Sequence, residues 1–544
     1  MRKSVLLVCS LALLALCPAC GDGSIRYEVA HTPTMGMSFW NAFQLNINED
    51  LVKDQADAVV ELGLADVGYK FINIDDGFQQ PRDSAGNFRY NADLFPGGMR
   101  AVADYIHSLG LKAGIYTDAG DNTCGSENKY PYGLGTGLVG HEEDDCRLFF
   151  DEWDYDFIKI DFCGGQNAGL NEREQYTKIG NAIRSCEKKD IIFNICRWRY
   201  PGTWAEDVAT SWRTTYDIRP WFSRVKYIID ENLWLQAYTR NGHYNDCDML
   251  EIGSQWPGSD ARLSHDEELT HMAYWCITSS PLIMGCDMRK VSQESLEVMM
   301  NTDLIAMNQD KLGLGAPVVQ RSGEVYVVAK DMGAIMGPRR AVVVMNLSEE
   351  PSEIDVSVEA LGFKGKIKLY DCFTHSYVED CSPQTSFKVS LAPHASAAYF
   401  VTGKRIEKSR YQAEESYMKM FTTIEGIASP RYLQNNSADM GTYAAGLGYS
   451  PDNWLEWGNV YSRHGGDYVA TFHYAAAAEA GFIVSVNGEE AGACECIIGG
   501  SDCDNWQTAN IRIHLEKGLN TVRLGCPDGP MPSIDFMEIR KESK

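Results

Sequence analysis

The sequence predicts an α/β protein in which a (β/α)8 (TIM) barrel is followed by an antiparallel β-sandwich domain and a second, C-terminal β-sandwich module. Three observations support this prediction. Strand-like runs alternate with amphipathic helical patterns from residue 33 to about residue 300. Several of these strands end in a carboxylate, which is where a barrel enzyme places its catalytic groups. Beyond residue 312, strands alternate with turns and no amphipathic helix separates them.

The first region divides into eight β-α units over about 270 residues, the usual size of such a barrel. A doubly wound open sheet is the alternative, but it would normally carry a Gly-rich phosphate turn after its first strand, and none is present. We expect strands at 34–39, 69–75, 111–117, 157–161, 191–196, 211–215, around 248 and at 281–285. We expect helices at 49–62, 99–109, 141–152, 171–187, 203–209, 221–236 and 264–278.

The remaining chain is predicted to form two further β domains. We expect the barrel to cover residues 25–312, the antiparallel β domain 313–403 and the C-terminal sandwich 411–541, with a charged linker at 404–410. The strands of the second region are expected at 325–329, 341–346, 354–358, 366–370, 386–389 and 397–401. Those of the third are expected at 468–474, 482–486, 511–515 and 521–524.

Composition narrows the class of partner. The chain has 544 residues and a net charge of -26, so it lacks the basic surface that nucleic acids and anionic membranes require. A neutral carbohydrate is compatible with this charge. The sequence leaves the oligomeric state open.

The N-terminus predicts an export signal over residues 1–20. A basic Met1-Arg2-Lys3 precedes an apolar stretch from Val5 to Leu16, which is too short to span a membrane comfortably. The following segment resembles a bacterial lipobox ending at Cys20, although Leu16 lies one place too far from the cysteine. An ordinary secretory signal is the alternative. We favour lipidation, which would place the protein in the periplasm or anchor it to the outer membrane.

Export permits disulfides, and fifteen of the 17 cysteines lie at or after Cys20. Counting alone does not assign their pairing. Cys372 and Cys381 could close a short loop. The cluster Cys494, Cys496 and Cys503 lacks the second ligand pair of a zinc site, so structural or free thiols are favoured there.

Two carboxylates at strand ends carry the candidate chemistry. Asp161 ends an apolar strand and Asp217 follows the Trp212-Arg213 strand two positions along the barrel. Cleavage of an acetal needs one carboxyl group to attack or support the anomeric carbon and a second to protonate the leaving oxygen. Different strand ends of one barrel can hold two such groups on opposite sides of a sugar. A helix N-cap is the alternative for any single aspartate.

At the level of motifs, the sequence resembles glycoside hydrolase family 27, the retaining α-galactosidases and α-N-acetylgalactosaminidases. The resemblance covers about residues 34–401. It rests on segments that occur in the same order and spacing: Pro33-Thr34-Met35-Gly36 with Trp40-Asn41, Tyr69 to Gly77, Lys159-Ile160-Asp161 with Cys163, Trp212 to Ile218, Asn245 to Gly253, Ser280 to Met284, and Ile305 to Asp310.

The resemblance implies a role for each matched position. Asp161 would be the nucleophile and Asp217 the acid/base. Trp40 would pack on the apolar face of the sugar, and Asp248 would shape the pocket. Four further residues would contact hydroxyl groups of the sugar. Asp75 and Asp76 would bind O4 and O6, Lys159 would bind O3 and O4, and Arg213 would bind O2.

The resemblance also implies a disulfide between Cys124 and Cys163, beside the nucleophile. Arg197 departs from the family pattern, because an acid precedes the tryptophan at this place in the family. This loop faces C2 of the sugar, so the departure leaves the choice between galactose and its 2-acetamido analogue open. Cys196 has no second cysteine before Arg213, so a second family disulfide is not expected.

The C-terminal region resembles carbohydrate-binding modules of families 6 and 35, on Tyr411 to Glu414, Gly518 to Leu524 and Ile534 to Phe536. The resemblance implies a structural calcium held by Glu414 and Asp535, and a plain structural sandwich is the alternative. Trp454 and Trp457 could stack on sugars or pack in the core. No cofactor is expected for catalysis.

The leading hypothesis is therefore an exported retaining α-galactosidase. The alternatives within the fold are glycosidases acting on α-N-acetylgalactosamine, β-L-arabinopyranose or dextran-like chains. Asp76 favours a sugar that bears an O6 hydroxyl, which arabinopyranose lacks. A non-catalytic glycan-binding lipoprotein is the alternative from another class, but a binder has no need of both Asp161 and Asp217.

Overall fold

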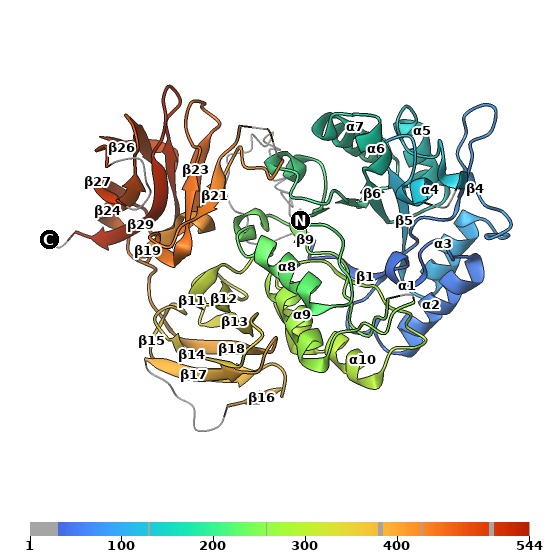
Figure 1. Ribbon diagram of the computed structural model, residues 1–544, viewed down its shortest axis with the longest axis horizontal. Helices are drawn as coiled ribbons and strands as arrows, with labels where there is room; N and C mark the ends of the chain where they lie inside the picture. Colours follow the sequence, from blue (N-terminus) through green and yellow to red (C-terminus); the bar gives the residue numbers. More distant parts are fainter. Residues whose placement is uncertain are drawn as a thin grey trace, which may run out of the picture.

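A computed structural model describes residues 31–542, except 129–130, 257, 379–384, 425, 427 and 500–504. The predicted signal segment, with Cys20, therefore lies outside the described residues. Figure 1 shows an α/β barrel drawn from blue to green, a yellow β region beside it, and an orange-to-red β region that ends at the C-terminus. Among the described residues, no helix combines the length and apolarity needed to cross a bilayer.

Eight parallel strands form the barrel, in the order β10-β1-β2-β5-β6-β7-β8-β9. A parallel bridge between Leu250 and Met284 joins the two ends of this order, so the sheet closes on itself. The strands are β1 (Met35–Ser38), β2 (Phe71–Asn73), β5 (Lys112–Asp118), β6 (Phe157–Asp161), β7 (Ile192–Ile195), β8 (Ser211–Arg213), β9 (Tyr244–Asp246) and β10 (Leu282–Met284).

The helices surround this sheet (Figure 1), and several of them begin at a polar cap. Asn48 and Asn171 each accept a backbone hydrogen bond at the N-terminus of a helix, and Ser264 forms a capping box with Glu267. The helices are α1 (Trp40–Phe43), α2 (Glu49–Glu61), α3 (Met99–Ser108), α4 (Cys124–Asn128), α5 (Glu142–Arg147), α6 (Cys163–Asn167), α7 (Glu172–Ser185), α8 (Phe222–Asn232), α9 (His265–Ile277), α10 (Gln293–Met299) and α11 (Thr302–Asn308).

Two predicted helices differ from the structure. The helix expected at 203–209 is only a 3-10 turn, Thr203–Asp207, and the helix expected at 141–152 changes to a π-helical turn over Leu148–Glu152. Shorter turns are Pro131–Gly133 and Gln236–Tyr238, and a small hairpin is made by β3 (Gln79–Gln80) and β4 (Arg89–Tyr90). The turn at 203–207 lies against the C-terminal region, as described below, so tertiary contacts replace helix propensity there.

The second region consists of two antiparallel sheets that share an apolar core. The larger has the order β11-β12-β13-β18-β15-β16 and the smaller pairs β14 with β17. The strands are β11 (Val318–Ser322), β12 (Val325–Asp331), β13 (Arg339–Asn346), β14 (Ser352–Ser357), β15 (Phe363–Asp371), β16 (Ser376–Tyr377), β17 (Ser386–Leu391) and β18 (Ser396–Arg405). β11 and β16 were not predicted. Cys372 is a buried free thiol, and Cys381 lies outside the described residues.

The third region is again built from two antiparallel sheets, β21-β22-β29-β24-β27, with β19 paired to β29, and β20-β23-β28-β25-β26. Trp454 and Trp457 are buried in its core, so both side chains pack rather than face solvent. Its strands are β19 (Arg410–Gln412), β20 (Tyr417–Met418), β21 (Arg431–Gln434), β22 (Thr442–Ala445), β23 (Trp454–Ser462), β24 (Gly466–Ala475), β25 (Gly481–Val486), β26 (Glu489–Glu495), β27 (Gln507–Leu515), β28 (Gly518–Gly525) and β29 (Ser533–Lys541); short 3-10 turns span Ala413–Glu415 and Asp439–Gly441.

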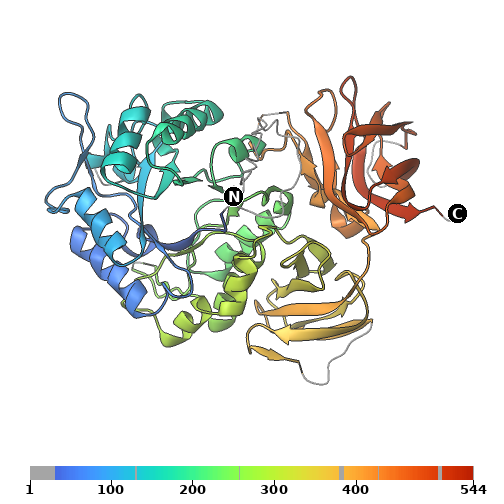
Figure 2. The ribbon, with the colours of Figure 1, turned by 180° about the vertical axis from the view of Figure 1, so that it is seen from behind.

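The predicted charged linker at 404–410 overlaps the end of β18 and the start of β19. β18 continues to Arg405, which is buried and bonded to Asp331 through Nη1 at 2.7 Å. The third region then packs directly on the barrel, as the two opposite views in Figures 1 and 2 agree. Arg240 stacks 3.6 Å from the ring centroid of Tyr417, and the hydroxyls of Tyr238 and Tyr432 lie 3.0 Å apart. The three regions are therefore joined by packed aromatic and ionic contacts.

Candidate active site

Buried carboxylates gather at the carboxyl ends of the barrel strands. Asp75 and Asp76 follow β2, Asp161 ends β6 and Asp248 follows β9, and each is at most 6% exposed. The barrel beneath them is closed, since the cavity lined by Asp75, Lys159, Arg213 and Asp248 measures only about 30 Å³. That volume suits a single water molecule. A sugar would therefore bind above this ring, at the mouth of the barrel.

One carboxylate oxygen of Asp161 lacks a hydrogen-bond donor among the described residues. Its Oδ1 atom is buried and has no hydrogen-bond partner within the described part of the chain. Burial raises the pKa of Asp161, and the ammonium group of Lys159 opposes that rise. An interaction with the free, buried thiol of Cys196 also acts to lower the pKa of Asp161.

Asp217 is the only one of the predicted carboxylates that faces the solvent. Its side chain is 42% exposed, and its Oδ1 accepts a hydrogen bond of 3.1 Å from Arg213 Nη2. The same Nη2 lies 2.7 Å from Asp248 Oδ2, which also accepts 2.8 Å from the Ile218 backbone N–H. Burial acts to raise the pKa of Asp217, but Arg213, with Lys159 and Arg219, holds it below its ordinary value.

Lys159 and Asp75 form a buried pair across the barrel. Lys159 Nζ donates to Asp75 Oδ2 at 3.1 Å, and Ser38 Oγ donates to the same oxygen at 3.0 Å. Burial acts to lower the pKa of Lys159, but the charge of Asp75 raises it well above its usual range. The ammonium group therefore stays charged between Asp75 and Asp161.

Asp76 lies against the loop after β5. Its Oδ2 accepts a hydrogen bond of 2.7 Å from Gly125 N, while its Oδ1 is buried without a partner among the described residues. A Cβ atom on Gly125 would lie 2.6 Å from Asp76 Oδ2, so only glycine permits this approach. Burial raises the pKa of Asp76 to about 7.

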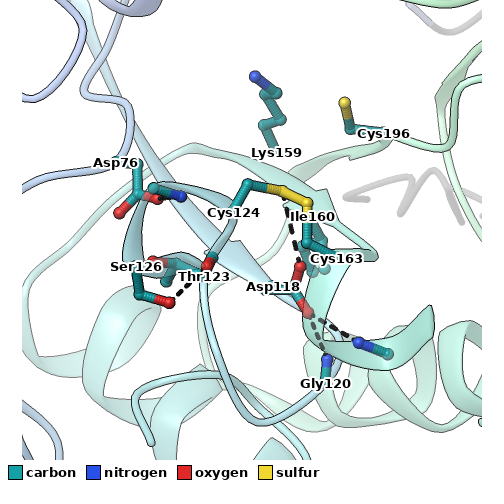
Figure 3. The surroundings of a disulfide bond; sticks show 12 residues. Asp76, Asp118, Gly120, Thr123, Cys124, Ser126, Lys159, Ile160, Cys163 and Cys196 are labelled. Atoms are coloured by element: carbon teal, nitrogen blue, oxygen red, sulfur yellow. Dashed lines mark hydrogen bonds between the residues drawn. A yellow bond between two sulfur atoms is a disulfide. The ribbon is translucent and has the colours of Figure 1, made fainter. Parts of the chain in front are cut away.

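A disulfide fixes this loop, as the family resemblance implied. Cys124 and Cys163 are bonded, and they join the loop after β5 to the start of α6, directly after the strand that ends in Asp161 (Figure 3). Asp118 lies beneath the bridge, where its Oδ1 accepts from the backbone N–H groups of Gly120 at 2.6 Å and Gly165 at 3.2 Å. Burial raises the pKa of Asp118 to about 8.

The raised pKa of Asp118 predicts a pH-dependent effect of its replacement. Because its folded-state pKa lies above the value of an unfolded aspartate, stability from the neutral form is complete below about pH 4 and is lost as pH rises through about 8. Asp118→Asn keeps the acceptor oxygen but cannot ionise. Its melting temperature relative to wild type should therefore rise by roughly 3 °C or more between pH 5 and pH 8. A constant difference across that range would contradict this interpretation.

The guanidinium group of Arg197 is bound by neighbouring side chains of the protein. Its Nε donates to Glu172 Oε2 at 2.9 Å, and its guanidinium lies 5.5 Å from the ring centroid of Phe162 and 5.2 Å from that of Trp198. Glu172 begins α7, and its Oε2 also accepts a hydrogen bond of 3.0 Å from Arg199 Nη2, so two guanidinium groups share one carboxylate. The structure thus places Arg197 beside Phe162, the residue after Asp161, with its Nε bonded to Glu172.

The sequence analysis missed a polar network behind Trp40 and Asp248. The Asn41 side-chain amide donates to Glu251, and the Glu251 backbone N–H donates to His271 Nε2 at 3.0 Å. Trp275 lies edge-on to His271, and its Nε1 donates to the backbone oxygen of Asp248 at 2.7 Å. Glu251 lies three residues beyond Asp248, inside a segment that already carried the resemblance, so its position could have been noticed.

Comparisons with known proteins agree with this geometry. The profile of the family described as "Alpha galactosidase A" (Melibiase_2) matches residues 32–310. The chain is 37% identical over 382 residues to Alpha-galactosidase 2 of Arabidopsis thaliana, covering 69% of this chain and 91% of that protein. It is 38% identical over 379 residues to an alpha-galactosidase of rice, Oryza sativa subsp. japonica, covering 69% and 85%.

Solved structures give the same relationship at the level of the fold. Alpha-galactosidase I of Mortierella vinacea aligns with a TM-score of 0.62 and 25% identity, covering 69% of this chain and 98% of that chain. A family 27 β-L-arabinopyranosidase of Geobacillus stearothermophilus aligns with a TM-score of 0.59 and 23% identity, covering 69% and 97%. The latter likeness shows the fold alone.

Proposed function

The chain belongs to the α-galactosidase A family, glycoside hydrolase family 27, and we propose that it is an α-galactosidase that releases terminal α-D-galactosyl residues with retention of configuration. The observation that carries this proposal is the pair of carboxylates at the barrel mouth. Asp161 is buried with an unpaired oxygen, Asp217 is partly exposed beside Arg213, and the charge of Asp217 acts on Asp161.

The proposed reaction has two displacements. Asp161 attacks the anomeric carbon while Asp217 gives its proton to the glycosidic oxygen, and the bond between that oxygen and C1 breaks. A water molecule then gives a proton to Asp217 and attacks C1, which frees Asp161 and leaves galactose in its original configuration. Lys159 balances the charge of Asp161 whenever that carboxylate is free.

The pKa shifts of the free site run against these roles, since the pKa of Asp161 is raised and that of Asp217 is lowered. Two coupled carboxylates share their protons as a unit. A sugar hydroxyl that engages Arg213 would weaken its ion pair with Asp217, and the pKa of Asp217 would rise. Formation of the glycosyl ester would then remove the charge of Asp161 and lower the pKa of Asp217 again, which suits its second role as base.

Asp75 and Asp76 supply the proposed selectivity for galactose. The buried, unpartnered Oδ1 of Asp76 lies at the mouth of the barrel, where it can accept a hydrogen bond from a sugar hydroxyl. A buried acceptor left unpaired penalises a substrate that lacks the matching donor. Galactose has both the O4 and the O6 hydroxyl, whereas arabinopyranose lacks O6. The rival sugar is α-N-acetylgalactosamine, and the pairing of Arg197 with Glu172 does not favour it.

The experiment that tests this function compares aryl α-galactoside, α-N-acetylgalactosaminide and β-L-arabinopyranoside side by side. The α-galactoside should have the highest kcat/KM, and NMR of its first-formed sugar should show the α anomer. A preference for either other substrate, or the β anomer as first product, would overturn the assignment. A protein that hydrolyses none of them would support the non-catalytic glycan-binding alternative.

We also propose that the protein is exported and anchored by lipid at Cys20. The basic and apolar N-terminal segment supports this proposal. The Cys124–Cys163 disulfide supports export independently, because such bonds persist in oxidising compartments.

For the C-terminal region we propose a carbohydrate-binding module with one structural calcium. The residues fit a hard cation: Glu414 Oε2 and Gln412 Oε1 are buried without hydrogen-bond partners in the described chain. Asp535 is 2% exposed, and burial raises its pKa to about 7, with the neighbouring charge of Asp439 adding to the rise. Calcium favours such oxygen ligands and would neutralise Glu414 and Asp535.

Calcium should therefore stabilise the C-terminal region. Saturating CaCl2 should raise its melting temperature over that in chelator, with a gain on the order of 2–3 kcal/mol at a hundredfold excess over Kd. Asp535→Asn should abolish the calcium response, while Asp528→Asn, in a turn after β28, should retain it. An identical melting temperature with calcium and with chelator would refute the site.

A further inference from the structure

The third region supplies hydrogen bonds to the loop after β7, which covers residues 196–210. The Tyr200 carbonyl oxygen accepts a hydrogen bond of 2.9 Å from Thr423 Oγ1. The next carbonyl oxygen, that of Pro201, accepts one of 3.1 Å from Thr422 Oγ1. The two threonines lie 223 and 221 residues further along the chain than their partners. The path of this barrel loop therefore depends on side chains of another region.

The loop and residues 417–424 of the third region also share an aromatic cluster. Tyr200 is fully buried, and its ring centroid lies 5.3 Å from that of Phe421 and 4.9 Å from that of Tyr238. Phe421 in turn stacks on Tyr238, with 4.9 Å between the centroids. Rings packed this closely cannot shift independently of one another. A movement of residues 417–424 would therefore displace Tyr200.

A buried cation joins a later part of the loop to the same segment. Arg240 Nη2 lies 3.2 Å from Glu206 Oε2, and the Arg240 guanidinium lies 3.6 Å from the ring centroid of Tyr417. The hydroxyl of Thr203, also in the loop, donates to the backbone oxygen of Lys419. Residues 417–424 thus hold the loop at several points along its length.

The start of the loop contacts the catalytic groups. Cys196 is its first residue and is buried, and Cys196 Sγ accepts a hydrogen bond of 3.7 Å from Arg213 Nη1. The same thiol interacts with the carboxylate of Asp161. The position of the loop therefore affects both the proposed nucleophile and the guanidinium group that binds the proposed acid/base.

Tyr200 provides a second connection to the same guanidinium group. Its ring lies edge-on to that of Trp212, with 6.2 Å between the centroids. Trp212 precedes Arg213 on β8, and Arg213 Nη2 donates a hydrogen bond of 3.1 Å to Asp217 Oδ1. A continuous series of packed groups therefore leads from Phe421 to Arg213, which is the kind of contact chain that can couple two regions.

We propose that residues 417–424 position the loop after β7 for catalysis, with Phe421, Thr422 and Thr423 as positioning residues. The inference rests on the proposed function, because it concerns the turnover of an α-galactoside. The third region then contributes to the hydrolysis of every substrate, including an aryl galactoside that carries no further sugar. This contribution is separate from any binding of glycans by the third region itself.

The double variant Thr422→Val/Thr423→Val tests the proposal in the full chain. Valine resembles threonine in shape but cannot donate the two hydrogen bonds. For an aryl α-galactoside, kcat should fall roughly tenfold with a smaller change in KM, because displaced catalytic groups mainly lose stabilisation of the transition state. Thr422→Ser/Thr423→Ser keeps both hydroxyls and should restore most of kcat. Thermal melting of each preparation shows that the measured protein is folded.

Thr471→Val is the matched control for these variants. Thr471 Oγ1 donates a hydrogen bond of 2.6 Å to Asn510 Oδ1, between β24 and β27 of the third region. The substitution therefore removes a threonine hydrogen bond from the same region without touching the loop after β7. It should leave both kcat and KM unchanged.

Phe421→Leu keeps the proposal falsifiable if the double valine variant folds poorly. It replaces the ring that packs on Tyr200 but removes no side-chain hydrogen bond, and kcat should fall by roughly threefold. An unchanged kcat in either folded variant, a loss confined to KM, or an equal loss in Thr471→Val would overturn the inference. Failure of the proposed function is distinct from these outcomes, because wild type itself would then leave the aryl α-galactoside intact.

Discussion

Asp161→Asn should lose nearly all turnover of an aryl α-galactoside while keeping its fold. The amide cannot form the glycosyl ester, so kcat should fall by about 10⁴-fold or more. This loss is equivalent to an increase of roughly 5.5 kcal/mol in the activation free energy. Stability should hold or rise, because the substitution removes a carboxylate whose pKa is raised by burial and whose Oδ1 has no partner in the described chain. Kinetics and thermal melting of the same preparation measure both effects.

Asp121→Asn is the matched control for that experiment. Asp121 is an exposed aspartate in the loop after β5, close in sequence to the disulfide, and its replacement should alter neither rate nor melting temperature. Near-normal turnover in folded Asp161→Asn would contradict the assignment of the nucleophile. If Asp161→Asn lost its activity and also unfolded, the result would indicate a structural role for Asp161 instead.

Asp217→Gly should lower turnover by roughly 10²- to 10⁴-fold, the usual contribution of a general acid and base. The loss should be larger for a disaccharide than for an aryl galactoside, because a sugar needs protonation to leave. The fold should survive, since Arg213 retains its 2.7 Å contact with Asp248.

Azide separates the two carboxylates by the product each variant makes. With Asp217→Gly, azide should replace water in the second displacement and give the α-galactosyl azide. With Asp161→Gly, azide should attack C1 directly and give the β-galactosyl azide. The reversed pair of products would exchange the two roles, which is the exchange that the free-site pKa shifts would suggest.

The barrel was predictable because its signals are local. The strand ending in Asp161 was predicted with its observed bounds, since an apolar run that stops at a carboxylate has few other interpretations. The turn at Thr203–Asp207 was not, because the Thr203 hydroxyl donates to the backbone oxygen of Lys419, 216 residues away. Contacts at such separation leave no periodic pattern in the sequence.

The candidate site shows the same division. The residue types at Asp161, Asp217 and Arg213 could be identified from motifs and strand ends. Their pairing could not: that Arg213 bridges Asp217 and Asp248 follows from loops that only the closed barrel brings together. The burial of Arg405 against Asp331 could not be predicted for a related reason, because it depends on the pairing of β18 with β15.

The central claim is that Asp161 becomes covalently linked to galactose during turnover. The most direct test is to quench the enzyme with acid while it hydrolyses a 2-fluoro-substituted α-galactoside, then digest it and identify the modified peptide by mass spectrometry. The peptide that contains Asp161 should gain the mass of one fluorogalactosyl group. A label on the peptide that contains Asp217, or no label despite turnover, would contradict the mechanism.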